Sequence, residues 1–308
     1  MIMIAGGTGR LGTQVVQLLT ARGLRVRILT REPERAKHLE NDLVEVMQGD
    51  VRDPEAVGRA ILGSETVISA IHGFAGTGTD NPRTIDLEGN SNLIRAAQTA
   101  GARRFILMSI QGAAPDHPME LFRMKYMAEQ ELRASTLAWT ILRPSAYMEL
   151  WAQLIGEPLI KKGKITVFGR GNNLINFVSV SDVARFVELA VADPGLRGKV
   201  VEVGGPQNLS MNQFAHELVN VTGKTGKIGH VPLPMMRIMS KLMKAFNPTL
   251  ARQIQAGVIM DTKDMSFDAA ETRSLYPSIP VTSLADVIRR DYAGSLSSAQ
   301  SILKTAQE

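Results

Sequence analysis

The sequence predicts an α/β protein whose core is a doubly wound parallel sheet, followed by a smaller α/β lobe. A glycine-rich turn follows a short apolar run at the start of the chain, and strand and helix patterns then alternate through the first half. The chain of 308 residues is long enough for a main domain and a smaller lobe. We expect residues 1–150 to form the main domain and residues 151–308 the C-terminal lobe. Because segments of the lobe are expected to interleave with the main domain, this boundary is approximate.

Composition excludes several function classes. The sequence has no cysteine, which excludes disulfides and thiolate sites, and its five scattered histidines lack the spacing of metal ligands. A net charge of +5 suits an anionic ligand, whereas an aromatic content of 5% argues against nucleic acid. No apolar run approaches the ~20 residues that span a bilayer, and the first strand leaves no space for a signal peptide. We therefore expect a cytoplasmic protein that acts on a small molecule.

The glycine turn has the spacing of a dinucleotide-binding site. Gly6, Gly9 and Gly12 lie three residues apart, between the apolar run 1–4 and a segment of helical periodicity that begins at Thr13. Without Cβ atoms, such a turn lets a pyrophosphate reach the backbone N–H groups at the helix N-terminus, where the helix dipole favours an anion. A tight turn that binds no ligand is the alternative.

Alternating strands and helices follow this turn. In the core we expect strands at 24–30, 43–47, 66–71, 105–109 and 139–142, and helices within 31–37, 54–62, 85–100 and 119–135. In the smaller lobe we expect strands at 164–168, 175–178 and 200–203, and helices at 181–192 and from Ser210 to 221. The succession predicts parallel strands covered by helices.

The end of the second predicted strand discriminates between the two nicotinamide cofactors. NAD sites usually carry an acidic residue there, which accepts a hydrogen bond from the ribose 2′-hydroxyl. Arg31 stands at that point, with Arg35 one helical turn further on, and two guanidinium groups suit the 2′-phosphate of NADP(H). Glu32 offers an NAD alternative. We expect NADP(H) to be preferred over NAD(H).

Two further strand ends would face the cofactor, because ligands of open α/β sheets bind at the carboxyl ends of the strands. Asp50 and Val51 follow the third predicted strand and would border the adenine, although a turn-forming role for Asp50 is equally open. Ala70 and Ile71 end the fourth strand and would lie beside the cofactor.

Four later stretches carry a family pattern, at 86–94 (DLEGNSNLI), 100–109 (AGARRFILMS), 139–144 (WTILRP) and 177–184 (FVSVSDVA). With the glycine turn, they resemble the atypical short-chain dehydrogenases of the NmrA-like NAD(P)-binding branch. More loosely, 231–246 is similar to a sub-branch with photosystem II assembly factors and respiratory complex I accessory subunits.

The resemblance implies a Rossmann core and a C-terminal lobe that closes over the nicotinamide end. It matches Lys125 to the family's active-site lysine and Ser109 to its active-site serine. For the cofactor, it places residues at the pyrophosphate (Gly6, Gly9, Arg10 and Leu11), the 2′-phosphate (Arg31 and Arg35), the adenine (Asp50 and Val51) and the middle of the dinucleotide (Ala70 and Ile71).

The usual catalytic tyrosine of that family is absent. Short-chain dehydrogenases use Tyr-x-x-x-Lys on one helix, where the ammonium lowers the pKa of the phenol and the phenol donates a proton as hydride arrives. Here Leu121 stands four residues before Lys125, and Tyr126 points ~100° away around the helix. Lys125 would bind the nicotinamide ribose or act as the acid itself; a surface lysine is its alternative. Ser109 would orient the substrate or form a strand-end hydrogen bond, and Tyr147 is the phenol that could replace the missing donor.

A methionine-rich segment at 235–246 has an amphipathic pattern. Apolar residues at 235, 238, 239, 242, 243 and 246 share one face, and three basic residues line another. We expect this helix to pack on the protein's own core; contact with a protein partner or an anionic membrane surface is the alternative. The small, polar end of the chain, 294–308, is expected to fray.

Two functions fit these features. The first is an NADP(H)-dependent oxidoreductase that reduces a carbonyl or activated double bond of an apolar small molecule. The second is a non-catalytic NADP(H)-binding redox sensor or assembly factor. The missing tyrosine favours the second function, whereas Lys125 and Ser109 favour the first, which is the function we expect.

Overall fold

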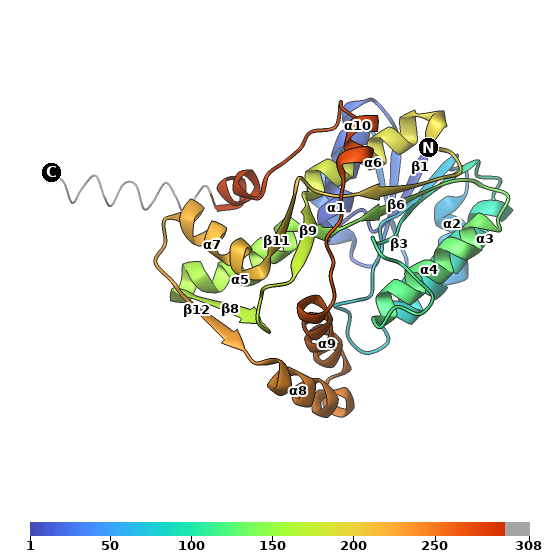
Figure 1. Ribbon diagram of the computed structural model, residues 1–308. Coiled ribbons are helices and arrows are strands. Elements are labelled where there is room, and N and C mark those ends of the chain that lie inside the picture. Colours follow the sequence, from blue (N-terminus) through green and yellow to red (C-terminus); the bar gives the residue numbers. More distant parts are fainter. Residues whose placement is uncertain (293–308) are drawn as a thin grey trace. The chain divides into compact units, whose positions relative to one another are not determined.

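In the computed structural model, which describes residues 1–292, the chain forms two units (Figure 1). The first unit contains Met1–Pro144 and Ser181–Val203. The second contains Ser145–Val180 and the described residues from Gly204 onward. The chain therefore returns to the first unit for one α-helix, one short 3-10 helix and one strand. The expected fraying of 294–308 lies outside the described residues.

A seven-stranded sheet forms the centre of the first unit. Every pairing in it is parallel, and the strand order is β10-β6-β5-β4-β1-β2-β3. The order reverses between β1 and β4, and ligands of doubly wound sheets bind at such a switch point. The predicted doubly wound parallel sheet is therefore confirmed. Its strands are β1 (Ile2–Ala5), β2 (Val26–Thr30), β3 (Val44–Gln48), β4 (Thr66–Ser69), β5 (Arg104–Met108), β6 (Ala138–Pro144) and β10 (Lys199–Val203).

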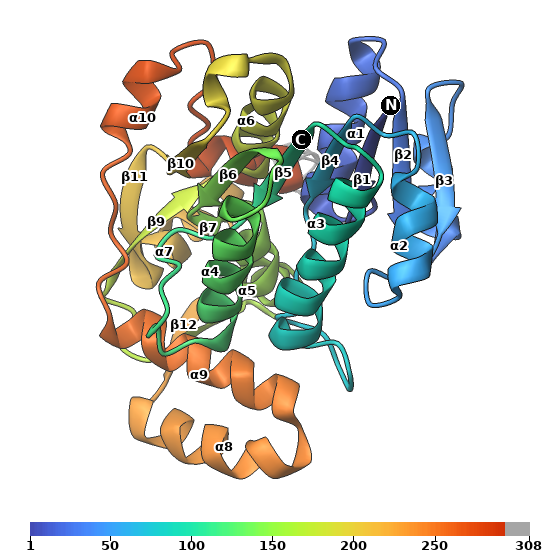
Figure 2. The same cartoon turned by 90° about the vertical axis from the view of Figure 1, so that its right-hand side faces the viewer.

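Helices cover both faces of this sheet (Figure 2). One face carries α1 (Arg10–Ala21) and α6 (Val180–Ala192), which are joined by an ion pair between Arg22 and Glu188. The other face carries α2 (Pro54–Ile61), α3 (Asn90–Thr99) and α4 (Glu120–Arg133). The apolar core on that side includes Val57, Leu93, Phe105 and Leu132, one residue from each of α2, α3, β5 and α4.

Two of the predicted helices differ from an α-helix. The segment after β2 forms a 3-10 helix, η1 (Pro33–Leu39), and the helix predicted at 85–100 begins as a π-helix, η2 (Pro82–Gly89), before α3. Asn81 and Thr84 cap η2 reciprocally, side chain to backbone. A proline is tolerated in the first turn because its nitrogen needs no partner there. Single π turns often occur at functional sites.

The second unit contains two small sheets. In one, β9 (Leu174–Val178) lies between β11 (Gln207–Ser210) and β7 (Ala146–Tyr147); in the other, β12 (Lys227–Val231) pairs with β8 (Lys164–Phe168). Phe177 and Phe214 meet edge to face in the core of this unit. The predicted N-cap Ser210 accepts from the Gln213 N–H. The helical elements are α5 (Met148–Lys162), η3 (Pro194–Leu196, in the first unit), α7 (Met211–Thr222), α8 (Leu233–Phe246), α9 (Pro248–Thr262) and α10 (Ala270–Leu275).

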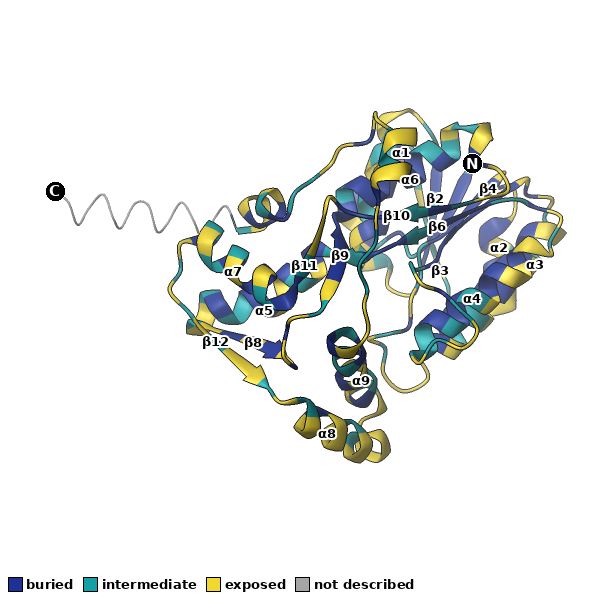
Figure 3. Cartoon of the chain, in the orientation of Figure 1, coloured by how far each residue is buried: buried dark blue, intermediate teal, exposed yellow. Residues whose placement is uncertain are grey.

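Helix α8 forms as predicted, but the expectation that its apolar face packs on the core is wrong. Five of the six residues of that face are exposed and the sixth, Met243, is partly exposed, whereas Met236, which the predicted face omits, is buried. Figure 3 shows that most of α8 is exposed. The reason is that α8 packs against α9 along one side, where Met236 meets Gly257. Within residues 1–292, no helix is both long and apolar enough to cross a membrane.

The packing of α1 against the glycine turn can be tested at Gly12 of α1, with Gly58 of α2 as the control. A Cβ on Gly12 would lie 2.1 Å from the Gly6 carbonyl oxygen, whereas one on Gly58 of α2 would meet nothing within 4 Å. We expect Gly12→Ala to lower the free energy of unfolding by ~1–3 kcal/mol, because backbone atoms cannot move aside. Gly58→Ala should raise it by ~0.5–1 kcal/mol through better helix propensity. Urea unfolding measures both, and effects of the same sign would contradict this packing.

Candidate functional site

The glycine turn lies where the strand order reverses. Gly6 follows β1 with a φ of +86°, and a Cβ there would lie 2.5 Å from the Ala70 carbonyl oxygen, just beyond β4. Only glycine combines this left-handed backbone with so close an approach. The turn therefore touches the end of β4 at the switch point of the sheet.

Helix α1 begins without a side-chain cap. Gly9 occupies the N-cap position, and the first turn of the helix contains no acidic residue. The first N–H groups of a helix have no partner within the helix, and its N-terminus carries a partial positive charge. Arg10 starts the helix with an exposed side chain, whereas the Leu11 side chain is buried. This helix end fits an anion such as a pyrophosphate.

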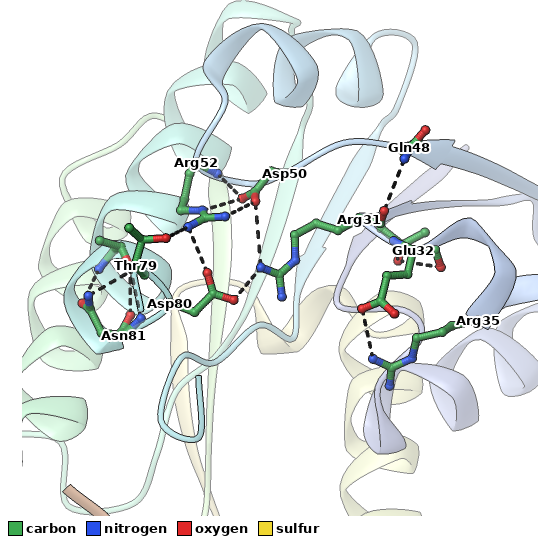
Figure 4. Close-up of polar contacts among 11 residues, drawn as sticks. Arg31, Glu32, Arg35, Gln48, Asp50, Arg52, Thr79, Asp80 and Asn81 are labelled. Atoms are coloured by element: carbon green, nitrogen blue, oxygen red, sulfur yellow. Dashed lines mark hydrogen bonds and ion pairs between the residues drawn. The ribbon is translucent and has the colours of Figure 1, made fainter. Parts of the chain in front are cut away.

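Arg31, directly after β2, belongs to an ionic network of four side chains. Its Nη1 lies 2.5 Å from Asp80 Oδ2 and 4.0 Å from Asp50 Oδ2. Arg52 contacts the same two carboxylates, Asp50 at 2.5 Å and Asp80 at 2.9 Å (Figure 4). The Arg52 hydrogen bond lowers the pKa of Asp50, although burial opposes this. Half of the Arg31 side chain is exposed, so a ligand can reach its guanidinium.

The other two residues predicted near the adenosine end lie beside this network. Arg35, in η1, has its Nη1 3.7 Å from Glu32 Oε1, and both side chains are exposed (Figure 4). Val51 is half-buried against the core, and its carbonyl accepts from Asn92 Nδ2 at 2.9 Å. The structure thus brings Arg31 and Asp50 together and leaves Arg35 paired with Glu32.

Lys125 extends from α4 into the interior of the first unit, where it is 4% exposed. Its Nζ donates to the carbonyl oxygens of Ile71 and Met108, each at 2.8 Å, and lies 3.0 Å from Asp86 Oδ1. The contact with Asp86 is an ion pair without the alignment of a hydrogen bond. The two carbonyls thus engage two of the three N–H donors of the ammonium group, and Asp86 compensates its charge. The alternative of a surface lysine is therefore wrong.

A buried polar chain continues from Asp86, which is fully buried in η2. Asp86 Oδ2 accepts from the Gly73 N–H at 2.8 Å, and its carbonyl accepts from Asn90 Nδ2 at 2.7 Å. The Asp86 carboxylate thus connects Lys125 with the loop after β4.

Ser109 follows β5, and its hydroxyl donates to Glu129 of α4. Glu129 is fully buried and also accepts two hydrogen bonds from Arg143, at 2.8 Å and 2.6 Å. Arg143 Nη1 contacts Glu202 at 3.0 Å, and the hydrogen bond with Glu129 contributes most to raising the Arg143 pKa. The one donor of the Ser109 hydroxyl is thus engaged within the first unit.

Tyr147 belongs to the second unit, where it ends β7 and occupies the N-cap position of α5 without a capping hydrogen bond from its side chain. Burial, and next the charge of Glu149, raise the pKa of its phenol, which makes it a weak acid. In the first unit, Lys125 and Ser109 meet at adjoining strand ends, because Lys125 binds the Met108 carbonyl immediately before Ser109.

Sequence reasoning assigned no role to two residues of this region, Asp86 and Glu129. A signal existed for Glu129, because it lies four residues after Lys125 on the same face of α4. No local signal linked Asp86 to Lys125, since the pairing depends on the π-helix. Among residues 1–292, no group of three acidic, histidine or cysteine side chains could hold a metal ion.

A model of the NAD(P)H-binding family matches residues 6–194, which include the glycine turn, Arg31 and Lys125. The chain belongs to the NAD(P)H-binding family. This membership agrees with the resemblance to NmrA-like proteins that the sequence shows.

This NAD(P)H-binding protein is similar to two kinds of relative. NAD(P)H azoreductase of Xenophilus azovorans is 30% identical over 228 residues, covering 73% of this chain and 74% of that one. Photosystem II assembly factor Ycf39 of Synechocystis sp. is 29% identical, covering 80% and 76%. The crystal structure of an NADPH-dependent quinone oxidoreductase from Escherichia coli, complexed with NADPH, has a TM-score of 0.76 at 24% identity, covering 95% and 100%. This last likeness shows the fold.

Removing the buried ammonium tests what the ion pair contributes. Lys125→Met leaves Asp86 as a buried charge without a counter-ion, so we expect the free energy of unfolding to fall by ~3–5 kcal/mol. The double variant Lys125→Met/Asp86→Asn should recover part of this loss, because no uncompensated charge remains. The control is Lys161→Met, an exposed lysine of α5, which should leave the unfolding midpoint nearly unchanged. A stable Lys125→Met single variant would contradict this interpretation.

Proposed function

We propose that this protein is an NADP(H)-dependent oxidoreductase that reduces a carbonyl or activated double bond of an apolar small molecule. The observation that carries the cofactor assignment is the uncapped start of α1 at the glycine turn, with Arg31 at the neighbouring strand end. Relatives named as an azoreductase and a quinone oxidoreductase support a redox reaction.

The residues at this edge of the sheet fit a phosphorylated dinucleotide. The turn offers the uncapped backbone N–H groups at the start of α1, and Arg31 offers an accessible guanidinium. When bound, NADPH would supply the hydride. We assign the pyrophosphate to Gly6, Gly9, Arg10 and Leu11, the 2′-phosphate to Arg31 and Arg35, the adenine to Asp50 and Val51, the middle of the dinucleotide to Ala70 and Ile71, and the nicotinamide ribose to Lys125.

A 2′-phosphate would compete with Asp80 for Arg31. Arg31 lies 2.5 Å from the Asp80 carboxylate, which carries one negative charge, whereas a phosphate carries ~1.5 to 2 and offers three oxygens. Arg52 can keep Asp80 in place after such an exchange, because it contacts Asp80 independently at 2.9 Å. NAD(H) has no phosphate at this point and gains nothing from Arg31. This difference supports a preference for NADP(H).

We propose that the candidate catalytic residues orient the reactants. Lys125 would fix the Ile71 and Met108 carbonyls at the ends of β4 and β5, because it donates to both while its charge is paired with Asp86. Ser109 donates to Glu129 and keeps oxygen lone pairs, which can accept a hydrogen bond from a hydroxyl of the substrate or of the reduced product. Tyr147 keeps its proton and is the remaining phenol donor.

The missing tyrosine narrows the substrate class. Hydride transfer adds two electrons and one proton to the acceptor, and one further proton completes the reduction. A simple ketone needs an acid in the transition state, whereas a quinone forms a stabilised hydroquinone anion that takes its proton from water. We therefore favour quinones and similarly activated acceptors.

A non-catalytic NADP(H)-binding protein is the second candidate. It is favoured by the engagement of the Lys125 donors and the Ser109 hydroxyl inside the first unit, and by the relatives named as photosystem II assembly factors. Such a protein would need the cofactor site without a proton donor.

NADPH oxidation assays separate these two candidates. We expect turnover with benzoquinones, naphthoquinones or azo dyes, and less with simple ketones, followed through the absorbance of the reduced nicotinamide. If water supplies the proton, Tyr147→Phe should keep kcat for a quinone within ~3-fold of the wild type, a difference below ~1 kcal/mol in barrier. Tight NADPH binding without turnover on any acceptor would overturn the enzymatic proposal and support the second candidate.

Cofactor titrations test the role of Arg31. We expect Arg31→Ala to weaken NADPH binding by ~10–100-fold, the loss of a hydrogen bond between charged groups, and NADH binding much less. Asp80→Asn should strengthen NADPH binding several-fold, because it removes the competing charge. Arg103→Ala is the matched control, since Arg103 is an exposed arginine paired with Glu65.

The combined variant Arg31→Ala/Asp80→Asn completes this test. Without Arg31, the second substitution should leave NADPH affinity unchanged, because competition needs the guanidinium. Equal losses of NADPH and NADH in Arg31→Ala would refute the 2′-phosphate contact. Calorimetry gives the NADPH affinities of the wild type, the two single variants and the double variant under one set of conditions.

A further inference from the structure

Helix α8 of the second unit presents an apolar stripe to solvent. The stripe consists of Met235, Ile238, Met239, Leu242 and Phe246, whose spacing places them on one side of the helix. These residues are 49%, 61%, 39%, 58% and 83% exposed, respectively. Single exposed apolar residues are ordinary, but a continuous row of five large ones marks an interaction surface.

The packing of α8 on α9 holds this stripe outward. Met236 is 1% exposed, and a Cβ on Gly257 of α9 would lie 2.9 Å from its Cε. Figures 1 and 2 show the two helices side by side, in agreement with their contacts. Met236 is rotated ~100° from Met235 around the helix. A helix fixed through Met236 therefore cannot bury the stripe against α9.

The chain around the stripe is cationic. Between Glu217 and Asp261 the sequence contains no acidic residue. Within α8, Arg237, Lys241 and Lys244 share the side away from the stripe, because they lie four and three residues apart. The remaining basic residues between those two acidic positions are Lys224, Lys227 and Arg252.

We propose that α8 docks in the interface of an anionic phospholipid bilayer, with the stripe at the acyl boundary and the basic side chains directed to the headgroup phosphates. Helices that lie in this interface combine Phe and Leu on one face with Lys and Arg on the other. Although the basic side chains lie on the side of α8 away from the stripe, they are long enough to bend toward the headgroups. They also lie within a Debye length of the charged surface.

Two other occupants fit the stripe less well. Protein interfaces depend on Trp, Tyr and Arg anchors with hydrogen-bonding groups, whereas the stripe has only flexible aliphatic side chains and one phenylalanine. A second copy of α8 would bring two cationic segments together, and like charges oppose such an association. Methionine and leucine adapt to a fluid acyl boundary without needing a shaped partner.

Vesicle flotation with the full chain tests this docking. We expect binding to phosphatidylcholine vesicles that contain phosphatidylglycerol, and at least ~10-fold weaker binding to vesicles of phosphatidylcholine alone. Ile238→Ser/Leu242→Ser/Phe246→Ser should weaken binding to the anionic vesicles by at least ~10-fold. Lys241→Gln/Lys244→Gln should remove most of the preference for the anionic lipid.

The matched control is Leu150→Ser/Leu154→Ser, which replaces two exposed leucines of α5 outside the stripe and should bind like the wild type. Thermal unfolding and NADPH binding verify that each variant is folded, and neither depends on the docking proposal. Absence of wild-type binding to anionic vesicles would overturn the proposal, as would unchanged binding by the stripe variant. A wild-type dimer that the stripe variant dissociates, without vesicle binding, would also overturn it and assign the stripe to self-association.

Discussion

The buried ion pair between Lys125 and Asp86 is the constraint on which the candidate site of the first unit depends. Burying either charge alone would cost several kcal/mol, so both must be present together and be satisfied by further partners. Lys125 holds the carbonyls of Ile71 and Met108, and Asp86 accepts from the Gly73 N–H. One ammonium group thereby joins α4, η2 and the residues just beyond β4 to the end of β5. The backbone at this edge of the sheet is thus ordered by the protein's own charges.

The network at Arg31 contrasts with this buried pair. Lys125 and Asp86 are excluded from water, so losing either partner leaves an uncompensated charge. Arg31 is half exposed, and pairs of that kind contribute only ~0–1 kcal/mol, so a phosphate can displace Asp80 at little cost. Burial therefore separates a permanent contact, which shapes the site, from an exchangeable one, which suits a ligand. Both lie at the carboxyl ends of the same sheet.

Local sequence patterns are sufficient to predict the core, whereas features that depend on long-range contacts could not be predicted from the sequence. The glycine turn, the strands of the core and the position of Arg31 follow from spacing within a few residues. Asp80 lies 49 positions from Arg31, and only the folded loop after β4 brings them together. Helix α5 was missed because Gly156 and Pro158 inside it are typical helix breakers. In α8, periodicity grouped the apolar residues correctly, but the contact of Met236 with Gly257 decided which side faces inward.

The same buried pair determines how much a tyrosine at position 121 could contribute to proton transfer. A lysine lowers the pKa of a neighbouring phenol because its positive charge favours the phenolate. Here the carboxylate of Asp86 lies 3.0 Å from Lys125 Nζ and compensates that charge. A phenol at position 121, on the same face of α4, would therefore gain little acidity from Lys125. The electrostatics of the whole region, rather than Leu121 alone, favours a substrate that takes its proton from water.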